Sequence, residues 1–263
     1  MTQEKIGKTL FASDYDGTLT RLGFMFPKTK KAIKAYRDEN HLFCADTGRC
    51  PAMFSKRKMK LYDYIIGSSG ARICDHEKNV IYQQAMDPED AVFVLQLAHD
   101  IKARHVIVHL ENSFFFARPR WLSWLVNLTL SLVRPKMVVD RIKRSDTVYQ
   151  ISINLRNKQQ VEEVLRRCAG RNVATNVNGC AVDVAHKECS KTLGIGILQK
   201  IINADRVYTI GDELNDYEML RDYEGFMIAH GNRKLEEVCK YKVLGIKEAI
   251  DIIMENERNE KPA

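Results

Sequence analysis

Residues Thr9 to Thr20 read T-L-F-A-S-D-Y-D-G-T-L-T, an apolar run that leads into two aspartates and a glycine. The run suits a buried strand, and Gly17 marks the point where the chain leaves the sheet. Because side chains on an extended segment repeat with a period of two, Asp14 and Asp16 can point the same way, just past the carboxyl end of that strand. Open α/β sheets bind ligands at that end. The stretch therefore predicts a functional site, although D-x-D-G alone is also a common turn sequence.

Two neighbouring carboxylates repel each other unless a cation or a shared proton relieves them. A Mg2+ ion takes oxygen ligands, commonly one or two carboxylates together with waters and a substrate phosphate. In such a site, Asp14 could attack phosphorus while Asp16 holds the proton for the leaving alkoxide.

The composition is that of a soluble globular protein, with 45% apolar and 29% charged residues. A chain of 263 residues favours two structural units, and its net charge of +7 attracts anions such as phosphorylated metabolites and, less specifically, nucleic acid. The seven cysteines are scattered and fit neither a disulfide framework nor a zinc site. The first residues, M-T-Q-E-K-I-G-K-T, lack an apolar signal core. A reducing cytoplasm is the expected location.

The longest apolar run, Trp121 to Val133, is shorter than the roughly 20 residues that cross a bilayer. We interpret it first as a core helix, then as a partner-binding helix, and last as a helix on a membrane surface.

Two more polar clusters stand next to predicted elements. The short apolar strand at residues 41–45 ends in D-T-G-R, where the Thr47 hydroxyl and nearby backbone amides would suit a phosphate oxygen. Ser190 can cap a helix whose first turn holds Lys191. A lysine is disfavoured at a helix N-terminus unless an anion lies beside it. Each cluster alone is also compatible with an ordinary turn or a surface lysine.

The sharpest cluster follows the predicted strand at residues 206–210 and reads G-D-E-L-N-D. It gathers three acidic side chains and an asparagine at the start of a helix, and capping explains one of them. A metal site explains the group better, with Asp212 as a ligand and with Asn215 and Asp216 orienting their neighbours.

The segment between these clusters has a different pattern. Strand-like and helix-like stretches alternate from residue 78 to residue 184, including a predicted helix at residues 88–103 and another at residues 158–168. We therefore predict a doubly wound α/β core formed by residues 1–77 and 185–263, with an inserted α+β cap at residues 78–184.

Taken in order, D-Y-D-G-T, T-G-R, a lysine at a helix start and G-D-x-x-N-D resemble the motifs of the haloacid dehalogenase superfamily of phosphohydrolases. The spacing and the G-S-S-G-A turn before the insertion are most similar to its Cof-type, type IIB branch. The resemblance covers about residues 7–77 and 185–250.

This resemblance implies a Mg2+-dependent phosphatase for a small phosphomonoester such as a sugar phosphate. It implies that Asp14 is the nucleophile that forms an aspartyl phosphate and that Asp16 is the general acid and base. The phosphoryl oxygens would be held by Thr47 and Lys191, with Asn215 contacting the same region. The metal would be bound by Asp14, the backbone carbonyl of Asp16 and Asp212, and Asp216 would support that shell.

Three features depart from the common motifs of the branch. Ala229-His230-Gly231-Asn232-Arg233 stands where A-M-G-N-A is common. Ser68-Ser69-Gly70-Ala71 replaces the common S-N-G-A, and the usual S-N-x-x-D-G-V loop is missing after Tyr241. Specificity is implied to come from the cap, where an arginine pairs well with phosphate or carboxylate. The candidate substrate residues are Arg49, Arg118, Arg120 and Asn232, and either His105 or His109 could also face the substrate.

Several alternatives remain open at this point. A phosphomutase would return the phosphoryl group instead of releasing it, and a binding or regulatory protein could keep the fold without turnover. Nucleic-acid 3′-end processing or binding is a third alternative, suggested by the net charge and by the basic cluster from Lys56 to Lys60. Because no binding module or aromatic stacking motif is recognisable, no nucleic-acid partner is expected. A monomer or a homodimer without a membrane span is expected.

Overall fold

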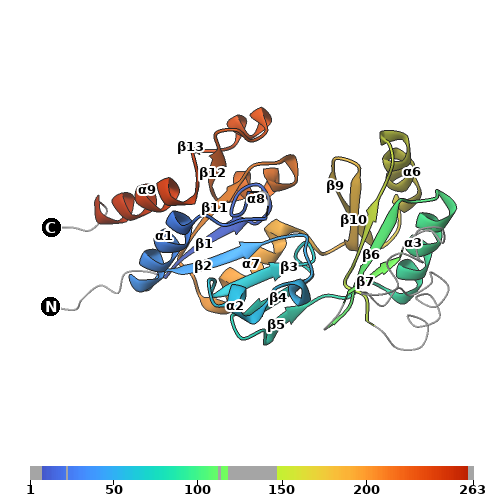
Figure 1. Cartoon of the computed structure of the whole chain (residues 1–263), viewed down its shortest axis with the longest axis horizontal. Helices are drawn as coiled ribbons and strands as arrows, with labels where there is room; N and C mark the ends of the chain where they lie inside the picture. The colour runs from blue at the N-terminus through green and yellow to red at the C-terminus, as the bar shows by residue number, and fades with distance from the viewer. Residues whose placement is uncertain (1–7, 22, 112–113, 118–146, 260–263) are drawn as a thin grey trace.

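The computed structural model describes residues 8–21, 23–111, 114–117 and 147–259, and these form two lobes, each built around one sheet (Figure 1). The predicted substrate residues Arg118 and Arg120 and the apolar run Trp121 to Val133 lie outside the described residues. Within the described part of the chain, we find no helix with the length and apolar character needed to cross a membrane.

The first lobe contains an eight-stranded sheet. Its first six strands in spatial order are parallel, and the last two are antiparallel to their neighbours. The spatial order is β13 (Tyr241–Val243), β12 (Glu224–Ile228), β11 (Arg206–Gly211), β1 (Thr9–Asp14), β2 (Leu42–Asp46), β3 (Tyr64–Gly67), β4 (Arg72–Asp75) and β5 (Val80–Gln83).

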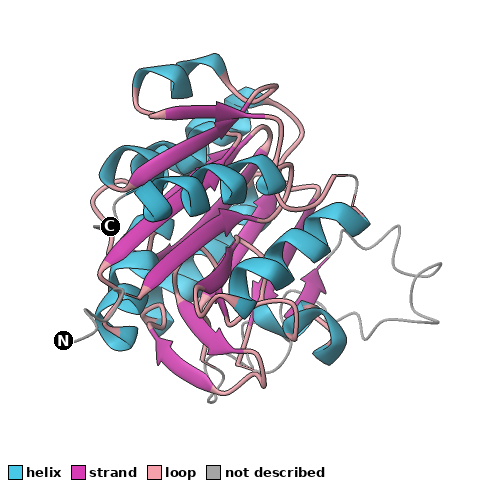
Figure 2. Cartoon of the chain, turned by 90° about the vertical axis from the view of Figure 1, so that its left-hand side faces the viewer, coloured by secondary structure: helices cyan, strands magenta, loops and turns pink. Residues whose placement is uncertain are grey.

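Helices cover both faces of this sheet (Figure 2). Helices α1 (Pro27–Asp38) and α9 (Ile246–Asn259) pack on one face, and α7 (Lys191–Ile202) and α8 (Tyr217–Asp222) pack on the other. This is the predicted doubly wound core. Short helices connect the strands: η1 (Pro51–Met53), α2 (Lys56–Met59), η3 (Leu214–Asp216) and η4 (Arg233–Glu237).

The alternation of side chains along β1 decides where its terminal aspartate points. Phe11 packs in the apolar cluster under α1 and α9, whereas Leu10 and Ala12 pack in the cluster under α7 and α8. Because the period of a strand is two, Asp14 lies on the same side as Leu10 and Ala12. The strand therefore directs Asp14 toward the start of α7.

The second lobe contains an antiparallel five-stranded sheet. Helices α3 (Pro88–Asp100) and α6 (Lys158–Cys168) pack on its outer face, away from the first lobe (Figure 1). Its strands lie in the order β7 (Phe114–Ala117), β6 (His105–His109), β8 (Gln150–Asn154), β10 (Ala181–His186) and β9 (Val173–Asn178).

The structure places two elements differently from the sequence patterns. Residues 173–184 have the sequence pattern of one extended stretch, but they form a hairpin of β9 and β10, because the chain turns at Gly179, whose φ is 58°. Strand β5 starts beyond residue 77, yet it pairs with β4 in the eight-stranded sheet, so the second sheet begins with β6. The division into a core and a cap at residues 77/78 and 184/185 stays a prediction.

Other expectations agree with the structure. Helix α3 begins at the predicted residue 88 and ends at Asp100, and α6 has the predicted bounds. All seven cysteines are free and five of them are buried, as expected for small apolar side chains.

Candidate active site

The two aspartates of the opening stretch lie at the carboxyl end of β1, but in different environments. The Asp14 side chain is buried, whereas about half of the Asp16 side chain is exposed. Gly17 follows with a φ of 99°, a backbone conformation that favours glycine. Both carboxylates line one cavity, as the sequence predicts.

Helix α7 delivers the predicted lysine to Asp14. Ser190 caps the helix, because its Oγ accepts a 3.1 Å hydrogen bond from the backbone N–H of Leu193. Lys191 is the first residue of the helix, and its Nζ lies 2.5 Å from Oδ1 of Asp14 and 2.7 Å from Oδ1 of Asp216. The anions that a lysine needs at a helix N-terminus are therefore side chains of the protein itself.

Gly70 leaves the space in which Ser190 and the first turn of α7 lie. A Cβ built on Gly70 would lie 2.1 Å from the carbonyl oxygen of Ser190, and the φ of Gly70 is 93°. The turn between β3 and β4 can therefore lie directly against the first turn of α7.

Burial and charge act in opposite directions at the Lys191 contact. Burial raises the pKa of the Asp14 carboxyl, and the Lys191 ammonium opposes that shift. Burial alone would lower the pKa of Lys191, but the carboxylates of Asp14, Asp216 and Asp46 outweigh it and raise that pKa. The ammonium group is therefore held charged in a buried place.

The loop after β11 brings in the remaining acidic side chains. Oδ2 of Asp216 accepts hydrogen bonds from the backbone N–H groups of Asp212 and Glu213, at 3.0 and 3.2 Å. Its other oxygen accepts from Lys191, so both oxygens of Asp216 are used inside the protein. Oδ1 of Asp212 accepts a 2.7 Å hydrogen bond from the Thr18 hydroxyl.

The carboxylates of Asp14, Asp212 and Asp216 together suit a hard divalent cation. Ligand atoms of Asp14, Asp212 and Asp216 all lie within 4.8 Å of one another, and Oδ2 of Asp14 is buried without a hydrogen-bond partner. Gly17 makes room for the group, since a Cβ there would lie 2.2 Å from Oδ2 of Asp212. Because Asp216 is already engaged on both oxygens, Asp14 and Asp212 are the better placed ligands for Mg2+ and Asp216 is suited to holding its neighbours.

The predicted phosphate-binding residues lie around the same carboxylates. Thr47 is buried at the end of β2, and its Oγ1 accepts a 3.1 Å hydrogen bond from the backbone N–H of Arg49. Asn215 lies in η3 beside the cavity, and its Oδ1 is buried without a partner. The structure thus brings Thr47, Lys191 and Asn215 to one cavity with the two aspartates of β1.

Arg49 also lines this cavity, and it is bound to Asp16. Its Nε and one terminal nitrogen donate 2.7 Å hydrogen bonds to the two carboxylate oxygens of Asp16, and its guanidinium lies over the ring of Tyr15. In the structure described, the partner of Arg49 is therefore the predicted acid and base.

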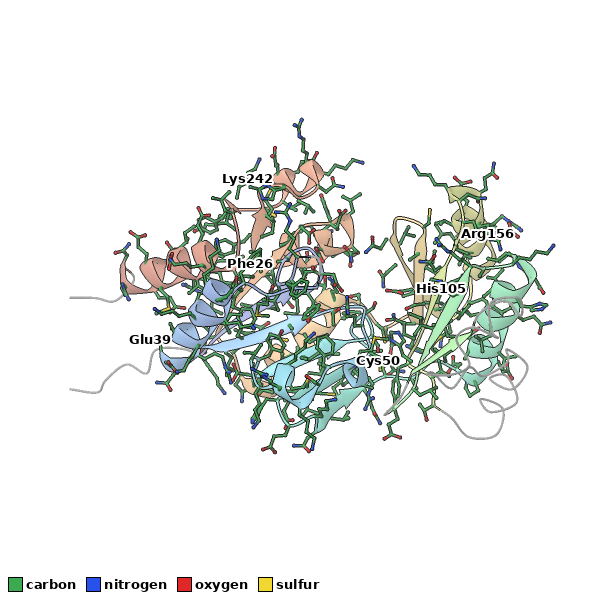
Figure 3. The ribbon with its side chains drawn as sticks, in the orientation of Figure 1. Phe26, Glu39, Cys50, His105, Arg156 and Lys242 are labelled. Atoms are coloured by element: carbon green, nitrogen blue, oxygen red, sulfur yellow. The ribbon has the colours of Figure 1, made fainter. Side chains whose placement is uncertain are left out.

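The cavity lies between the two lobes and has a volume of about 520 Å³. Figure 3 labels Cys50 near the junction of the lobes, where its Sγ lies 3.8 Å from the carbonyl oxygen of Leu110. Pockets of 300–1,000 Å³ hold small-molecule ligands. The second lobe contributes Ile107, His109, Ser152, Asn176, Val177, Asn178 and Asp183 to the wall.

Two of the predicted substrate residues have other surroundings. Asn232 caps η4 through a 3.2 Å hydrogen bond from the backbone N–H of Lys234, and its own backbone N–H donates to the carbonyl oxygen of Asp212. Neither Asn232 nor His105, which Figure 3 labels on the second lobe, is among the residues that line the cavity. His109 does line it, and its Nδ1 lies 3.0 Å from Oγ of Ser68.

Ser152 and Asp183 are not among the residues predicted for the site, although the alternation of apolar and polar residues in their strands shows which way they point. In β10, Val182 and Val184 pack into the apolar cluster of the second lobe, so Asp183 between them points to the opposite face. In β8, Ile151 and Ile153 flank Ser152 in the same way. The polar residue in each alternation faces the cavity.

Comparisons with known proteins show the family to which the chain belongs. A family model described as haloacid dehalogenase-like hydrolase matches residues 11–250. The chain belongs to this family. The predicted superfamily and its α/β fold are therefore confirmed, and the chain is assigned to a family of enzymes.

Individual relatives of this haloacid dehalogenase-like chain are distant in sequence. A Buchnera aphidicola protein with a provisional phosphatase name is 25% identical over 224 residues, which are 80% of this chain and 82% of that protein. The structure of BT4131, described as a subclass IIB sugar phosphatase, superposes with a TM-score of 0.77 at 19% identity and covers 94% of this chain and 99% of its own. BT1666, from Bacteroides thetaiotaomicron, superposes with a TM-score of 0.76 at 16% identity and covers 98% and 97%. At these identities, the two structures establish the fold alone.

Proposed function

We propose that this protein is a Mg2+-dependent phosphatase that hydrolyses a small phosphomonoester, such as a sugar phosphate, through an aspartyl-phosphate intermediate. One observation carries the proposal: Nζ of Lys191 lies 2.5 Å from Asp14 and 2.7 Å from Asp216 at the wall of a cavity that Thr47 also lines. A buried lysine beside a carboxylate that has one free oxygen suits a nucleophile that receives a phosphoryl group. The phosphatase names of the relatives support the same class of reaction.

In the first step, a carboxylate oxygen of Asp14 forms a bond to phosphorus while the bond from phosphorus to the leaving oxygen breaks. Asp16, in its protonated form, donates its proton to that leaving oxygen. Thr47 and Lys191 hold the phosphoryl oxygens, where negative charge gathers in the transition state. Asn215 contacts the same region.

In the second step, water attacks the phosphorus of the aspartyl phosphate, Asp16 takes a proton from that water, and the Asp14 carboxylate is released with inorganic phosphate. Mg2+, held by Asp14, the backbone carbonyl of Asp16 and Asp212, would supply positive charge that offsets the phosphoryl oxygens. Asp216 fixes the backbone of Asp212 and the Lys191 ammonium, which keeps both in place.

The test is release of inorganic phosphate from p-nitrophenyl phosphate and from a panel of phosphorylated metabolites, with Mg2+ or with EDTA. We expect metal-dependent turnover that falls by at least about a thousandfold in Asp14→Asn. Asp251→Asn is a matched control, because Asp251 is an exposed carboxylate on α9, paired with Lys247. A folded protein that releases no phosphate from any compound would exclude the phosphatase and favour the phosphomutase or the binding protein.

A further inference from the structure

One row of side chains crosses the sheet of the second lobe and faces the cavity. In the ladders of that sheet, Ile107 is paired with Ser152, Ser152 with Asp183, and Asp183 with Asn176. All four residues line the cavity. The wall opposite Asp14 is therefore a continuous strip that offers an apolar side chain, a hydroxyl, a carboxylate and an amide.

Asp183 is the member of this strip that contacts the turn beside the predicted phosphate site. A Cβ built on Gly48 would lie 2.7 Å from Oδ2 of Asp183, so the carboxylate lies against the turn that follows Thr47. Gln150 fixes this contact between the lobes, because its Nε2 donates to the carbonyl oxygen of Gly48 at 2.9 Å and to Oγ of Ser152 at 2.8 Å. Asp183 in turn is hydrogen-bonded to Ser152.

The charges around the cavity are unfavourable for an anionic leaving group. Among the described lining residues, the two basic ones are Arg49 and Lys191, and both already form ion pairs with carboxylates. His109, from the second lobe, is neutral, because burial lowers its pKa to about 3. Asp183 is the charged side chain that the described part of the second lobe contributes to the wall.

The same wall suits hydroxyl groups. A carboxylate accepts hydrogen bonds, an amide accepts and donates, and a serine hydroxyl does both, so an uncharged polyhydroxy group could satisfy the whole strip. A carboxylate or a second phosphate at this place would lose its hydration and meet Asp183, and the described residues of the wall offer no unpaired cation to compensate.

We propose that Asp183 is a specificity-determining residue that accepts hydrogen bonds from hydroxyls of an uncharged leaving group and disfavours phosphomonoesters whose leaving group carries a negative charge. The proposal rests on the phosphatase function proposed above and specifies its substrate class. Because burial raises the pKa of Asp183 to about 6, the carboxylate carries its negative charge at pH 8, where the selection is expected to be strongest.

The test compares substrates that differ in the charge of the leaving group on a similar skeleton. The first pair is glycerol 3-phosphate and 3-phosphoglycerate, and the second is glucose 6-phosphate and 6-phosphogluconate. For the wild type at pH 8, we expect kcat/KM to favour the uncharged member of at least one pair by about tenfold or more. Equal rates for both members, or a preference for the acidic ones, would overturn the proposal.

The variant Asp183→Asn removes the charge and keeps the shape. We expect it to lower the ratio of uncharged to acidic substrate by about tenfold, mainly through KM. Asp100→Asn is the matched control, because Asp100 is a partly exposed carboxylate at the end of α3 on the outer side of the same lobe, and it should leave the ratio unchanged. An equal loss for both members of a pair in Asp183→Asn would mean that the residue acts structurally, and this would exclude a role in selection.

Turnover of p-nitrophenyl phosphate separates this proposal from the proposed function. If the wild type hydrolyses p-nitrophenyl phosphate but does not distinguish the pairs, only the role of Asp183 is wrong. If no compound is hydrolysed, the phosphatase is wrong, and calorimetric binding of glycerol 3-phosphate and 3-phosphoglycerate to the wild type and to Asp183→Asn still decides the role of Asp183. The role of Asp183 is supported if the wild type binds glycerol 3-phosphate more tightly than 3-phosphoglycerate and Asp183→Asn does not. It is overturned if the wild type binds the two compounds equally.

Discussion

Arg49 donates hydrogen bonds of 2.7 Å to both carboxylate oxygens of Asp16, one from Nε and one from a terminal nitrogen. The two residues come from different strand ends, since Asp16 follows β1 and Arg49 follows β2. Such a two-point contact fixes the direction of the carboxylate, which a single hydrogen bond would not do. Arg49 therefore serves to orient the proposed acid and base.

We predict that Arg49→Gln lowers kcat/KM for p-nitrophenyl phosphate by about tenfold, because Asp16 loses its orientation. Arg49→Lys should restore little of the activity, since a lysine cannot form the same planar contact. Steady-state kinetics of the two variants and the wild type check this. Full activity of Arg49→Lys would show that a positive charge is sufficient at this position, and this would contradict the role of Arg49 in orienting the Asp16 carboxylate.

A second prediction concerns the space that Gly17 leaves for Asp212. In Gly17→Ala, the new Cβ would lie 2.2 Å from Oδ2 of Asp212, so the carboxylate must leave its present position. We expect the Mg2+ concentration for half-maximal activity to rise by about tenfold or more, as losses at metal-supporting positions do.

Gly23→Ala is the control for this experiment. Gly23 also has a positive φ, 79° against 99° for Gly17, but a Cβ there would meet no atom within 4 Å. Both variants carry backbone strain, whereas only Gly17→Ala displaces a carboxylate. A similar change in Mg2+ dependence for both would mean that strain in the loop, and not the position of Asp212, controls metal binding.

A third prediction concerns the buried ammonium between Asp14 and Asp216. In Lys191→Met, two buried carboxylates lose their cation, which costs about 3–5 kcal/mol when one partner of a buried pair is removed. We expect the free energy of unfolding in urea with EDTA to fall by about that amount, and activity to be lost. Because Mg2+ would supply positive charge at the same place, it should stabilise Lys191→Met more than it stabilises the wild type. If Mg2+ stabilised both proteins equally, this would contradict the view that Mg2+ and the Lys191 ammonium neutralise the same carboxylates.

Much of the first lobe could be predicted from the sequence because its signals are local. The apolar run before Asp14, the cap at Ser190 and the polar cluster after β11 each identify an element and its end. Parallel strands bring the ends of β1 and β11 to one edge of the sheet, and the order of the motifs, through the resemblance to the haloacid dehalogenase superfamily, predicts Lys191 at the same place as Asp14 and Asp212.

The partners of these residues could not be predicted in the same way. The contact between Arg49 and Asp16 depends on how two loops approach each other, and the position of Asp183 depends on how the second lobe lies over the first. Neither geometry is encoded in a short stretch of sequence. The alternation in β10 predicts which side of the strand Asp183 occupies, but it does not tell which lobe or ligand that side meets.

The surroundings of Asp46 could not be predicted from the sequence either, and they lead to a prediction on the pH dependence of stability. It precedes Thr47 in the sequence, and nothing there indicates that its carboxyl is fully buried. Burial raises the pKa of Asp46 to about 7. The folded protein therefore keeps a proton on Asp46 at pH values between about 4 and 7, where the unfolded chain has already lost it.

Since the folded state binds more protons in that range, lowering the pH from 8 to 5 should stabilise the folded wild type at this residue. Asp46→Asn cannot bind that proton, so the difference in unfolding free energy between wild type and variant isolates the effect from all other titrating groups. We expect this difference to shift in favour of the wild type by up to about 3 kcal/mol as the pH falls from 8 to 5, because about two pH units of that range lie below the pKa of the folded protein. Urea denaturation of both proteins with EDTA at several pH values measures it. A difference that does not vary with pH would mean that Asp46 is ionised in the folded protein throughout the range, and that the neighbouring Lys191 compensates its charge.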